Sequence, residues 1–283
     1  MHKPCPQLVV LPKTTSEVSQ LVGHCYEHGY PIVPSGGRTG MAGGAVACQG
    51  EVVLSLERMN QVLEVDSVGL TITAQAGAVT EKLQIAAQEV GLQFPIDLGA
   101  KGSCLIGGNI ATNAGGLKFI RYGGTRDHVL GLEVVLADGQ VLDMDSHLHK
   151  NNTGYDLKQL FIGAEGTLGI ITKATLRLMP PSMPRSLGMF GVSDFDAIYA
   201  LLKHARQANG ILAAFEFFSD KAHAVVKQHM RGTRRLFEKE YPYYALIELE
   251  SSDQEAFENF FSKAYEDGAI EDALIASSTA EER

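Results

Sequence analysis

The sequence predicts an α+β protein whose chain divides into two parts. Segments with strand-like and helix-like patterns alternate along its 283 residues, which is the pattern of mixed folds. Glycine is distributed unevenly, because 25 of the 30 glycines lie at or before Gly169. Pro180, Pro181 and Pro184 follow, and each proline restricts itself and its predecessor to extended backbone. We therefore place a boundary between the two parts near residue 184.

The first part begins with a short apolar strand and a helix that starts at Thr14. Thr14 and Glu17 have the spacing of a capping box, and apolar residues follow at helical intervals. A second amphipathic helix, over residues 80–90, should end at Gly91. The dipeptide Asp138-Gly139 is typical of a tight hairpin between two strands. The predicted strands cover residues 8–11, 32–34, 52–56, 70–74, 132–136 and 141–142.

The second part repeats strand and helix patterns up to the end of the sequence. A helix over 194–207 is followed by the stop signal Asn209-Gly210, and a helix over 254–265 should end near Gly268. The other predicted elements are a helix over 222–229 and strands over 212–218, 244–249 and 270–276. The sequence stops soon after the last strand, over residues 277–283, and we interpret this as a sign of truncation.

Composition excludes several classes of function. Lys and Arg number 24 against 33 Asp and Glu, so a formal charge of −9 argues against binding nucleic acid or an anionic membrane. No apolar stretch approaches the ~20 residues that span a bilayer, and the N-terminus has no apolar signal core. The four cysteines are far apart and form no C-x-x-C pair. We expect a soluble, cytoplasmic protein.

Three glycine clusters are the candidate binding loops, over residues 34–44, 107–116 and 163–171. Without a Cβ, glycine lets backbone N–H groups approach an anion closely, so a pyrophosphate can be held without lysine. An isolated Gly-Gly is usually only a turn, but three long clusters of small residues favour a binding site. No two glycines lie two positions apart, so the Rossmann fingerprint is absent, and so is the Walker A motif. Another type of nucleotide fold is indicated.

At these residues the sequence resembles the FAD-linked 2-hydroxyacid dehydrogenases of the vanillyl-alcohol oxidase superfamily, whose FAD domain is of the p-cresol methylhydroxylase type. It is most similar to D-2-hydroxyglutarate dehydrogenase and its D-lactate and glycolate-oxidising relatives. The matching stretches cover most of residues 5–180, and the match is weaker beyond. They are 34–44, 95–104, 106–124, 129–143 and 152–176, then 214–217 and 245–248.

The resemblance implies that the first loop wraps the FAD pyrophosphate, that the second stretch lies along pyrophosphate and flavin, and that the third is at the adenosine end. Some relatives attach flavin to a histidine where this sequence has Thr39, so non-covalent FAD is expected. The implied cofactor-binding residues are Ser35, Gly36, Gly37, Arg38, Thr39, Gly40, Met41, Leu98, Gly99, Ser103, Gly107, Gly108, Asn109, Thr112, Glu165, Gly166, Gly169 and Ile170.

Several of these side chains have a second interpretation that the sequence leaves open. Arg38 could pair with a phosphate or be a solvated surface arginine. Asn109 and Asn113 could donate to flavin oxygens or simply form turns. His128 is expected to be structural, and the histidines of residues 147–149 are expected to lie in a solvated loop rather than bind a metal.

The resemblance implies an FAD-binding domain of two α/β subdomains over residues 4–183 and a partial cap domain over 184–283. It implies oxidation of a small D-2-hydroxy acid (2-hydroxyglutarate, lactate or glycolate type) to the 2-oxo acid by hydride transfer to flavin. The family's substrate arginine and metal ligands lie beyond the position of Arg283. Family members also begin before the strand at Leu8, so we expect a chain that is truncated at both ends and inactive by itself, with a natural short paralogue as the alternative, and we name no catalytic residue or metal ligand. A non-catalytic FAD-binding subunit of a larger complex is the alternative, and the electron acceptor and a homodimer are left open.

Overall fold

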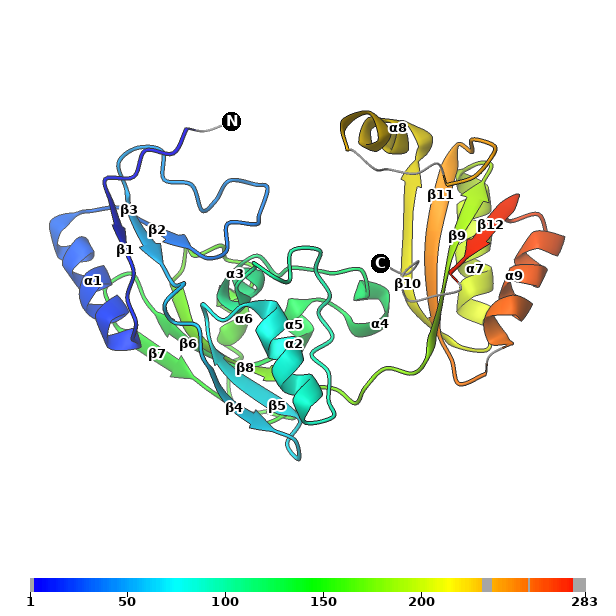
Figure 1. Ribbon diagram of the computed structural model, residues 1–283. Helices are drawn as coiled ribbons and strands as arrows, with labels where there is room; N and C mark the ends of the chain where they lie inside the picture. Colours follow the sequence, from blue (N-terminus) through cyan, green and yellow to red (C-terminus); the bar gives the residue numbers. More distant parts are fainter. Residues whose placement is uncertain (1–2, 231–235, 254, 277–283) are drawn as a thin grey trace. The chain divides into compact units, whose positions relative to one another are not determined.

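A computed structural model of the chain describes residues 3–230, 236–253 and 255–276. It consists of two compact units, coloured along the sequence in Figure 1. The first unit comprises Met1–Gly116 and Gly123–Pro181. The second comprises Ser182–Arg283 together with a six-residue segment, Leu117–Tyr122, from the middle of the first unit's sequence.

A small parallel sheet opens the first unit. Its strands β1 (Leu8–Val10), β2 (Ile32–Ser35) and β3 (Val52–Ser55) lie in the order β1-β3-β2, and α1 (Thr15–His28) connects β1 to β2. The capping prediction is confirmed, because the Thr14 hydroxyl accepts the Glu17 N–H at 3.2 Å. The Glu17 carboxylate accepts the N–H of Lys13, one residue before the cap position.

A five-stranded antiparallel sheet forms the second layer of the first unit. Its order is β4-β5-β8-β6-β7, and the hairpin predicted at Asp138-Gly139 joins β6 to β7. Helices α2 and α3 pack on this sheet, whose apolar residues form one core with those of α1 and β3. The bounds are β4 (Val62–Asp66), β5 (Thr71–Gln75), β6 (Val129–Val135), β7 (Val141–Met144), β8 (Ile170–Arg177), α2 (Thr80–Glu89), α3 (Ile106–Ala111), α5 (Thr125–His128) and α6 (Lys158–Phe161).

The second unit has the ferredoxin-like βαββαβ arrangement. Its antiparallel sheet has the order β10-β11-β9-β12, and α7 and α9 pack together against it through Phe190, Phe257 and Phe260 (Figure 1). An extra helix, α8, follows β10. The bounds are β9 (Arg185–Val192), α7 (Phe195–Gln207), β10 (Ile211–Ser219), α8 (Asp220–His229), β11 (Tyr243–Glu250), α9 (Ala256–Glu266) and β12 (Asp272–Ile275).

Three strands were not predicted, and the last of them shows why. β4 follows the loop after β3, β8 begins at Ile170 within the third glycine cluster, and β9 follows the proline cluster. β9 contains Gly188 and Gly191, which weaken a strand pattern. The structure shows their purpose: a Cβ at Gly188 would collide with the Phe190 and Phe257 rings, and one at Gly191 with the Tyr241 ring. Aromatic rings occupy the space that these glycines leave open.

The end of the chain partly matches the predictions. α7 begins one residue after the predicted start, and Asp194 caps it, because its carboxylate accepts the Ala197 N–H at 2.8 Å. The last strand starts at Asp272, two residues after the predicted start, and the preceding Ala269 and Ile270 are buried in the core of the unit. Residues 277–283, interpreted as a truncated end, lie outside the described residues. No helix in the described part of the chain is long and apolar enough to cross a membrane.

Candidate cofactor pocket

A cavity of about 750 Å³ lies in the first unit, where the three glycine clusters meet. Its volume is within the range of ~300–1,000 Å³ that small-molecule and cofactor sites occupy. The loop after β2, the segment before α3, α3 itself and the loop before β8 all contribute to its wall. Residues more than 130 positions apart in the sequence therefore share one site, as the glycine pattern predicted.

The structure places almost all of the predicted cofactor-binding residues on this wall. The exception is Ser103, whose hydroxyl donates to the Ala100 carbonyl at 3.4 Å. The lining residues that were predicted are Ser35, Gly36, Gly37, Arg38, Thr39, Gly40, Met41, Leu98, Gly99, Gly107, Gly108, Asn109, Thr112, Glu165, Gly166, Gly169 and Ile170.

The first loop lines the cavity and contains backbone N–H groups that are not used in backbone hydrogen bonds of the described residues. Among the described residues, none of the N–H groups of residues 36–40 donates to a backbone carbonyl. Arg38 has a φ of +55°, and a residue in this left-handed region turns successive N–H groups toward one side. Such a concave row of N–H groups is suited to an anion. The loop therefore provides what a pyrophosphate needs without a lysine.

The glycines of the cavity wall serve two different purposes. At Gly37 and Gly107 a Cβ would collide with neighbouring segments, the first with the backbone of Ser103 and Cys104 and the second with Ala76. These two glycines let the loops approach one another. At Gly40 and Gly108, by contrast, no atom lies within 4 Å of the position that a Cβ would take. There the missing side chain leaves open space beside the cavity.

The side chain of Asn109 connects segments of the cavity wall through contacts inside the protein. It is buried, and its side-chain NH₂ donates to the Thr80 hydroxyl at 2.6 Å and approaches the Cys104 sulfur at 3.5 Å. Asn113 has a φ of +46°, and its side-chain oxygen accepts the Arg126 N–H at 3.0 Å. Both amides are thus engaged inside the protein, which agrees with the turn-forming interpretation for Asn113.

The third cluster is attached to the other two. The Glu165 N–H donates to the Ala111 carbonyl at the end of α3, at 2.8 Å, and Glu165 itself has a φ of +53°. A Cβ at Gly166 would touch the Pro34 ring at the end of β2. The charged side chains on the wall are Arg38 and Glu165, and that of Arg38 is 60% exposed with its guanidinium 3.8 Å from Glu57. Arg38 is therefore accessible to a phosphate.

Sequence reasoning named few residues of the apolar part of the wall. Pro34, Ala42, Ala111, Ala114 and Ile171 lie inside the three glycine clusters, whereas most of the others come from the N-terminal segment, from strands and from the continuation of the first loop, for which there was no signal. Small and apolar side chains there can pack against a flat ring system. They include Pro4, Pro6, Val9, Pro34, Ala42, Ala45, Val46, Ala47, Val53, Leu56, Ala76, Ala100, Cys104, Leu105, Ala111, Ala114 and Ile171.

The histidines that the sequence analysis set aside as structural or solvated lie outside the cavity wall in the first unit. His128 is buried with its ring edge-on to Phe94. A ring nitrogen of His147 is 3.4 Å from the Thr71 hydroxyl, and one of His149 is 2.7 Å from the Gly69 carbonyl oxygen. In the part of the chain that the structure describes, no three His, Cys, Asp or Glu side chains gather as a metal site requires.

Comparison with protein families defines the class. Residues 6–145 match the FAD binding domain, and residues 183–283 match the C-terminal domain of FAD linked oxidases. The chain belongs to the FAD-linked oxidases, and FAD is the cofactor of this class. The cavity fits FAD, since it combines unused backbone donors, an accessible arginine and apolar walls.

The particular relatives are named D-2-hydroxyglutarate dehydrogenase. The protein from Stutzerimonas stutzeri is 46% identical over 279 residues, which are 97% of this chain and 60% of the relative. The one from Xanthomonas citri is 44% identical over 281 residues, covering 98% of this chain and 59% of the relative. The rat protein, named as mitochondrial, is 43% identical over 278 residues, covering 96% and 52%. The chain thus spans between about half and 60% of the length of these relatives.

Solved structures agree on the fold. An alkyldihydroxyacetonephosphate synthase matches with a TM-score of 0.76 at 22% identity, covering 99% of this chain and 54% of its own. A variant of Phl p 4, described as a glucose oxidase, matches with a TM-score of 0.66 at 17% identity, covering 95% and 52%. At these identities the likeness concerns the fold alone.

Proposed function

We propose that this chain is the FAD-binding part of an oxidoreductase that oxidises a small D-2-hydroxy acid to the 2-oxo acid. The observation that carries the proposal is the cavity itself, in which three distant glycine clusters meet and the N–H groups of residues 36–40 have no backbone acceptor within the described part of the chain. The names of the relatives favour 2-hydroxyglutarate over lactate or glycolate as the acid.

The residues of the wall have separate tasks in this proposal. The N–H groups of residues 36–40 hold the pyrophosphate, and the Arg38 guanidinium neutralises part of its charge. Glycine at positions 40 and 108 keeps the cavity clear, and the apolar wall packs against the ring system. Bound FAD would supply the hydride acceptor, while the protein supplies placement and the exclusion of competing reactions. With Thr39 in the first loop, we propose that the cofactor is held without a covalent bond.

Substrate chemistry sets further requirements. A 2-hydroxy acid needs a cation for its carboxylate and a base for its hydroxyl proton, and general-base help alone is worth ~100–10,000-fold in rate. We assign neither role to a residue of this chain. We propose that the 283-residue chain binds FAD but does not oxidise the acid by itself. We also propose that the electron acceptor reacts with the full-length enzyme. A homodimer and a cytoplasmic location stay predictions, and the rat relative is named mitochondrial.

The test has two stages. The purified chain is incubated with FAD, desalted and precipitated with acid; we expect yellow flavin in the supernatant, and flavin in the pellet would contradict the non-covalent assignment. A folded chain that takes up no FAD would overturn the cofactor site. The loaded chain is then mixed anaerobically with D-2-hydroxyglutarate, D-lactate or glycolate, and flavin absorbance is followed. Rapid bleaching by any of them would show that a complete active site lies within these residues.

A further inference from the structure

The segment Leu117–Tyr122, called the strap below, leaves the sequence of the first unit and packs in the second. It includes the short helix α4 (Phe119–Tyr122), which lies against β10. The residues before it line the cavity as far as Gly115, two positions from Leu117. The strap is thus the direct covalent continuation of the cofactor loop.

The two ends of the strap are tied to each other in the first unit. Both the N–H and the hydroxyl of Thr125 donate to the Ala114 carbonyl, at 3.1 and 2.7 Å. At the entrance, a Cβ on Gly116 would overlap the Asp97 carbonyl, so only glycine fits there. At the exit, Gly123 has a φ of +76°, which glycine adopts without strain. This closed neck ties the two chain segments that lead into and out of the strap, and Ala114 at the neck is also a lining residue of the cavity.

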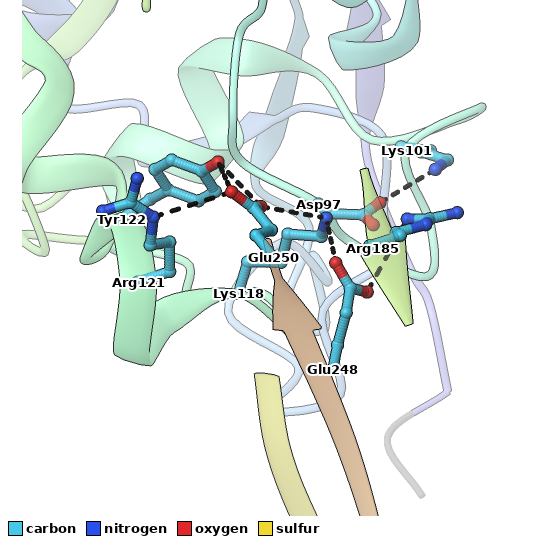
Figure 2. A network of polar contacts seen from close by, with 8 residues as sticks. All are labelled: Asp97, Lys101, Lys118, Arg121, Tyr122, Arg185, Glu248 and Glu250. Atoms are coloured by element: carbon cyan, nitrogen blue, oxygen red, sulfur yellow. Dashed lines mark hydrogen bonds and ion pairs between the residues drawn. The ribbon is translucent and has the colours of Figure 1, made fainter. Parts of the chain in front are cut away.

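Lys118, Arg121 and Tyr122, called the strap tip below, lie against two buried carboxylates of β11. Glu248 and Glu250 are 7% and 1% exposed, and they point to the same face of the sheet. The Lys118 ammonium lies 2.7 Å from the Glu248 carboxylate and 4.0 Å from that of Glu250, between the two in Figure 2. The Lys118 side chain is itself only 12% exposed. The ion pairs are therefore largely removed from water.

Two more strap residues complete the group around Glu250. The Tyr122 hydroxyl donates to its carboxylate at 3.0 Å, and the Arg121 guanidinium lies 3.8 Å away (Figure 2). Within the contiguous sequence of the second unit, Arg185 is 3.6 Å from Glu248 but is 41% exposed. Removing one partner of a buried ion pair is costly because the remaining charge is left without water or counter-ion. The face of β11 thus depends on the strap for its charge balance.

We propose that the strap couples occupancy of the cofactor cavity to the order of the second unit, through the Lys118, Arg121 and Tyr122 contacts with Glu248 and Glu250. Filling the cavity fixes the loop up to Gly115, and the closed neck passes that constraint to the strap tip. By linkage the effect is reciprocal, so loosening the tip weakens cofactor binding. The proposal rests on the proposed function in one respect, because FAD is used as the ligand that fills the cavity. The link between the strap and the cavity loop can also be tested without FAD.

The experiment is hydrogen exchange of the whole chain with and without FAD, alongside FAD affinity from flavin fluorescence. In the wild type we expect FAD to slow exchange over residues 243–250, which are outside the cavity wall. Lys118→Glu should abolish that response and weaken FAD affinity by about fivefold or more, the lower end of usual coupling strengths. Lys118→Glu/Glu248→Lys restores opposite charges and should recover both. Tyr122→Phe, which removes only one hydroxyl, should shift both in the same direction by less.

Lys158→Glu is the matched control. Lys158 is 17% exposed and pairs with Asp156 at 2.6 Å, but it lies in the first unit outside the strap. It should leave the FAD response over 243–250 unchanged. Equal exchange over 243–250 with and without bound FAD in the wild type would overturn the coupling, and so would an undiminished response in Lys118→Glu.

Failure of the wild type to bind FAD would overturn the proposed function, and the ligand-free chain then decides the coupling. Without FAD, Lys118→Glu must speed exchange over both 243–250 and the cavity segment 107–116. A change confined to 243–250 would show that the ion pairs only hold the second unit together.

Discussion

The cavity of the first unit and the ion-pair group of the second treat polar groups in opposite ways. Around the cavity, the N–H groups of residues 36–40 have no backbone acceptor among the described residues, and the accessible Arg38 is only loosely paired. On β11, the carboxylate of Glu250 is almost fully buried and receives the Tyr122 hydroxyl and two nearby cations. Polar groups that are satisfied within the protein stabilise the fold. Those left open indicate where a ligand is held.

The glycines repeat this contrast within one loop. Gly37 has no room for a side chain, because the backbone of Ser103 and Cys104 is in contact with it. Gly40, three positions later, faces open space. Gly37 is needed for the fold and Gly40 for the ligand. The sequence alone does not distinguish these two roles. Substitutions can separate these two roles.

The largest effect should come from Lys118→Met, which leaves the buried Glu248 and Glu250 without their shared cation. We expect a loss of about 3 kcal/mol in the stability of the second unit, the scale for breaking a buried ion pair. Urea unfolding followed by circular dichroism measures it. Lys158→Met serves as the control and should cost less than ~1 kcal/mol, because Asp156 is half exposed and returns to water. Equal losses in the two variants would contradict the contrast drawn between the cluster and an ordinary ion pair.

Gly40→Val should affect the ligand without affecting the fold. No atom lies within 4 Å of a Cβ there, so the thermal unfolding of the free chain should stay the same. FAD affinity should fall by ~1–3 kcal/mol, the scale of one lost buried hydrogen bond plus strain. Gly37→Ala is the comparison variant, and it should lower the unfolding temperature because its Cβ collides with backbone. Unchanged FAD affinity in a folded Gly40→Val chain would mean that this loop is only a turn.

The smallest effect concerns Asp145 in the first unit, which forms a partly exposed ion pair with Lys173. Burial opposes its ionisation, but hydrogen bonds from Thr175, at 2.6 Å, and Lys173, at 3.0 Å, hold the pKa of Asp145 below its usual value. A lowered pKa in the folded state stabilises the protein above the unfolded-state pKa of about 4, and this contribution is lost as the pH falls through the folded value. Since the pair is partly exposed, we expect about 0.5 kcal/mol.

Unfolding of the wild type and of Asp145→Asn at pH 6 and at pH 3 measures this contribution. The variant should lose less stability than the wild type on acidification. An equal loss in both would show that Asp145 contributes nothing to the acid sensitivity.

Much of the fold could be predicted because its signals are local. The hydroxyl of Thr14 and the carboxylate of Asp194 each cap a helix through an N–H three residues away, so neighbouring letters are enough to find them. Gly91 and Gly268 end helices with a positive φ for the same reason. The pocket was predictable because its glycines occur in long clusters. β9 was missed because its two glycines weaken the strand pattern, and two of the rings that fill their space, Phe257 and Tyr241, lie about 50 or more residues later in the chain.

What the sequence could not provide is the distant partner of a polar group. Asn109 was a candidate flavin ligand, but its NH₂ reaches Thr80, which is 29 positions earlier. No local sequence pattern around Lys118 indicates an ion pair, because its partners, Glu248 and Glu250, lie 130 or more positions later. Such pairings depend on how the units fold, so a one-dimensional pattern does not contain them.

The strap also has a consequence for protein synthesis and for dividing the protein into fragments. Lys118 leaves the ribosome more than 120 residues before Glu248, whereas the newly made chain of the second unit offers the partly exposed Arg185 to the same carboxylate. To pair Glu248 with Lys118, the second unit recruits a segment that has already emerged with the first unit. A fragment that begins at residue 182 would carry the ferredoxin-like sheet but leave the carboxylates of Glu248 and Glu250 without the strap. The second unit therefore consists of two separate stretches of sequence, and a single cut in the gene would not isolate both of them.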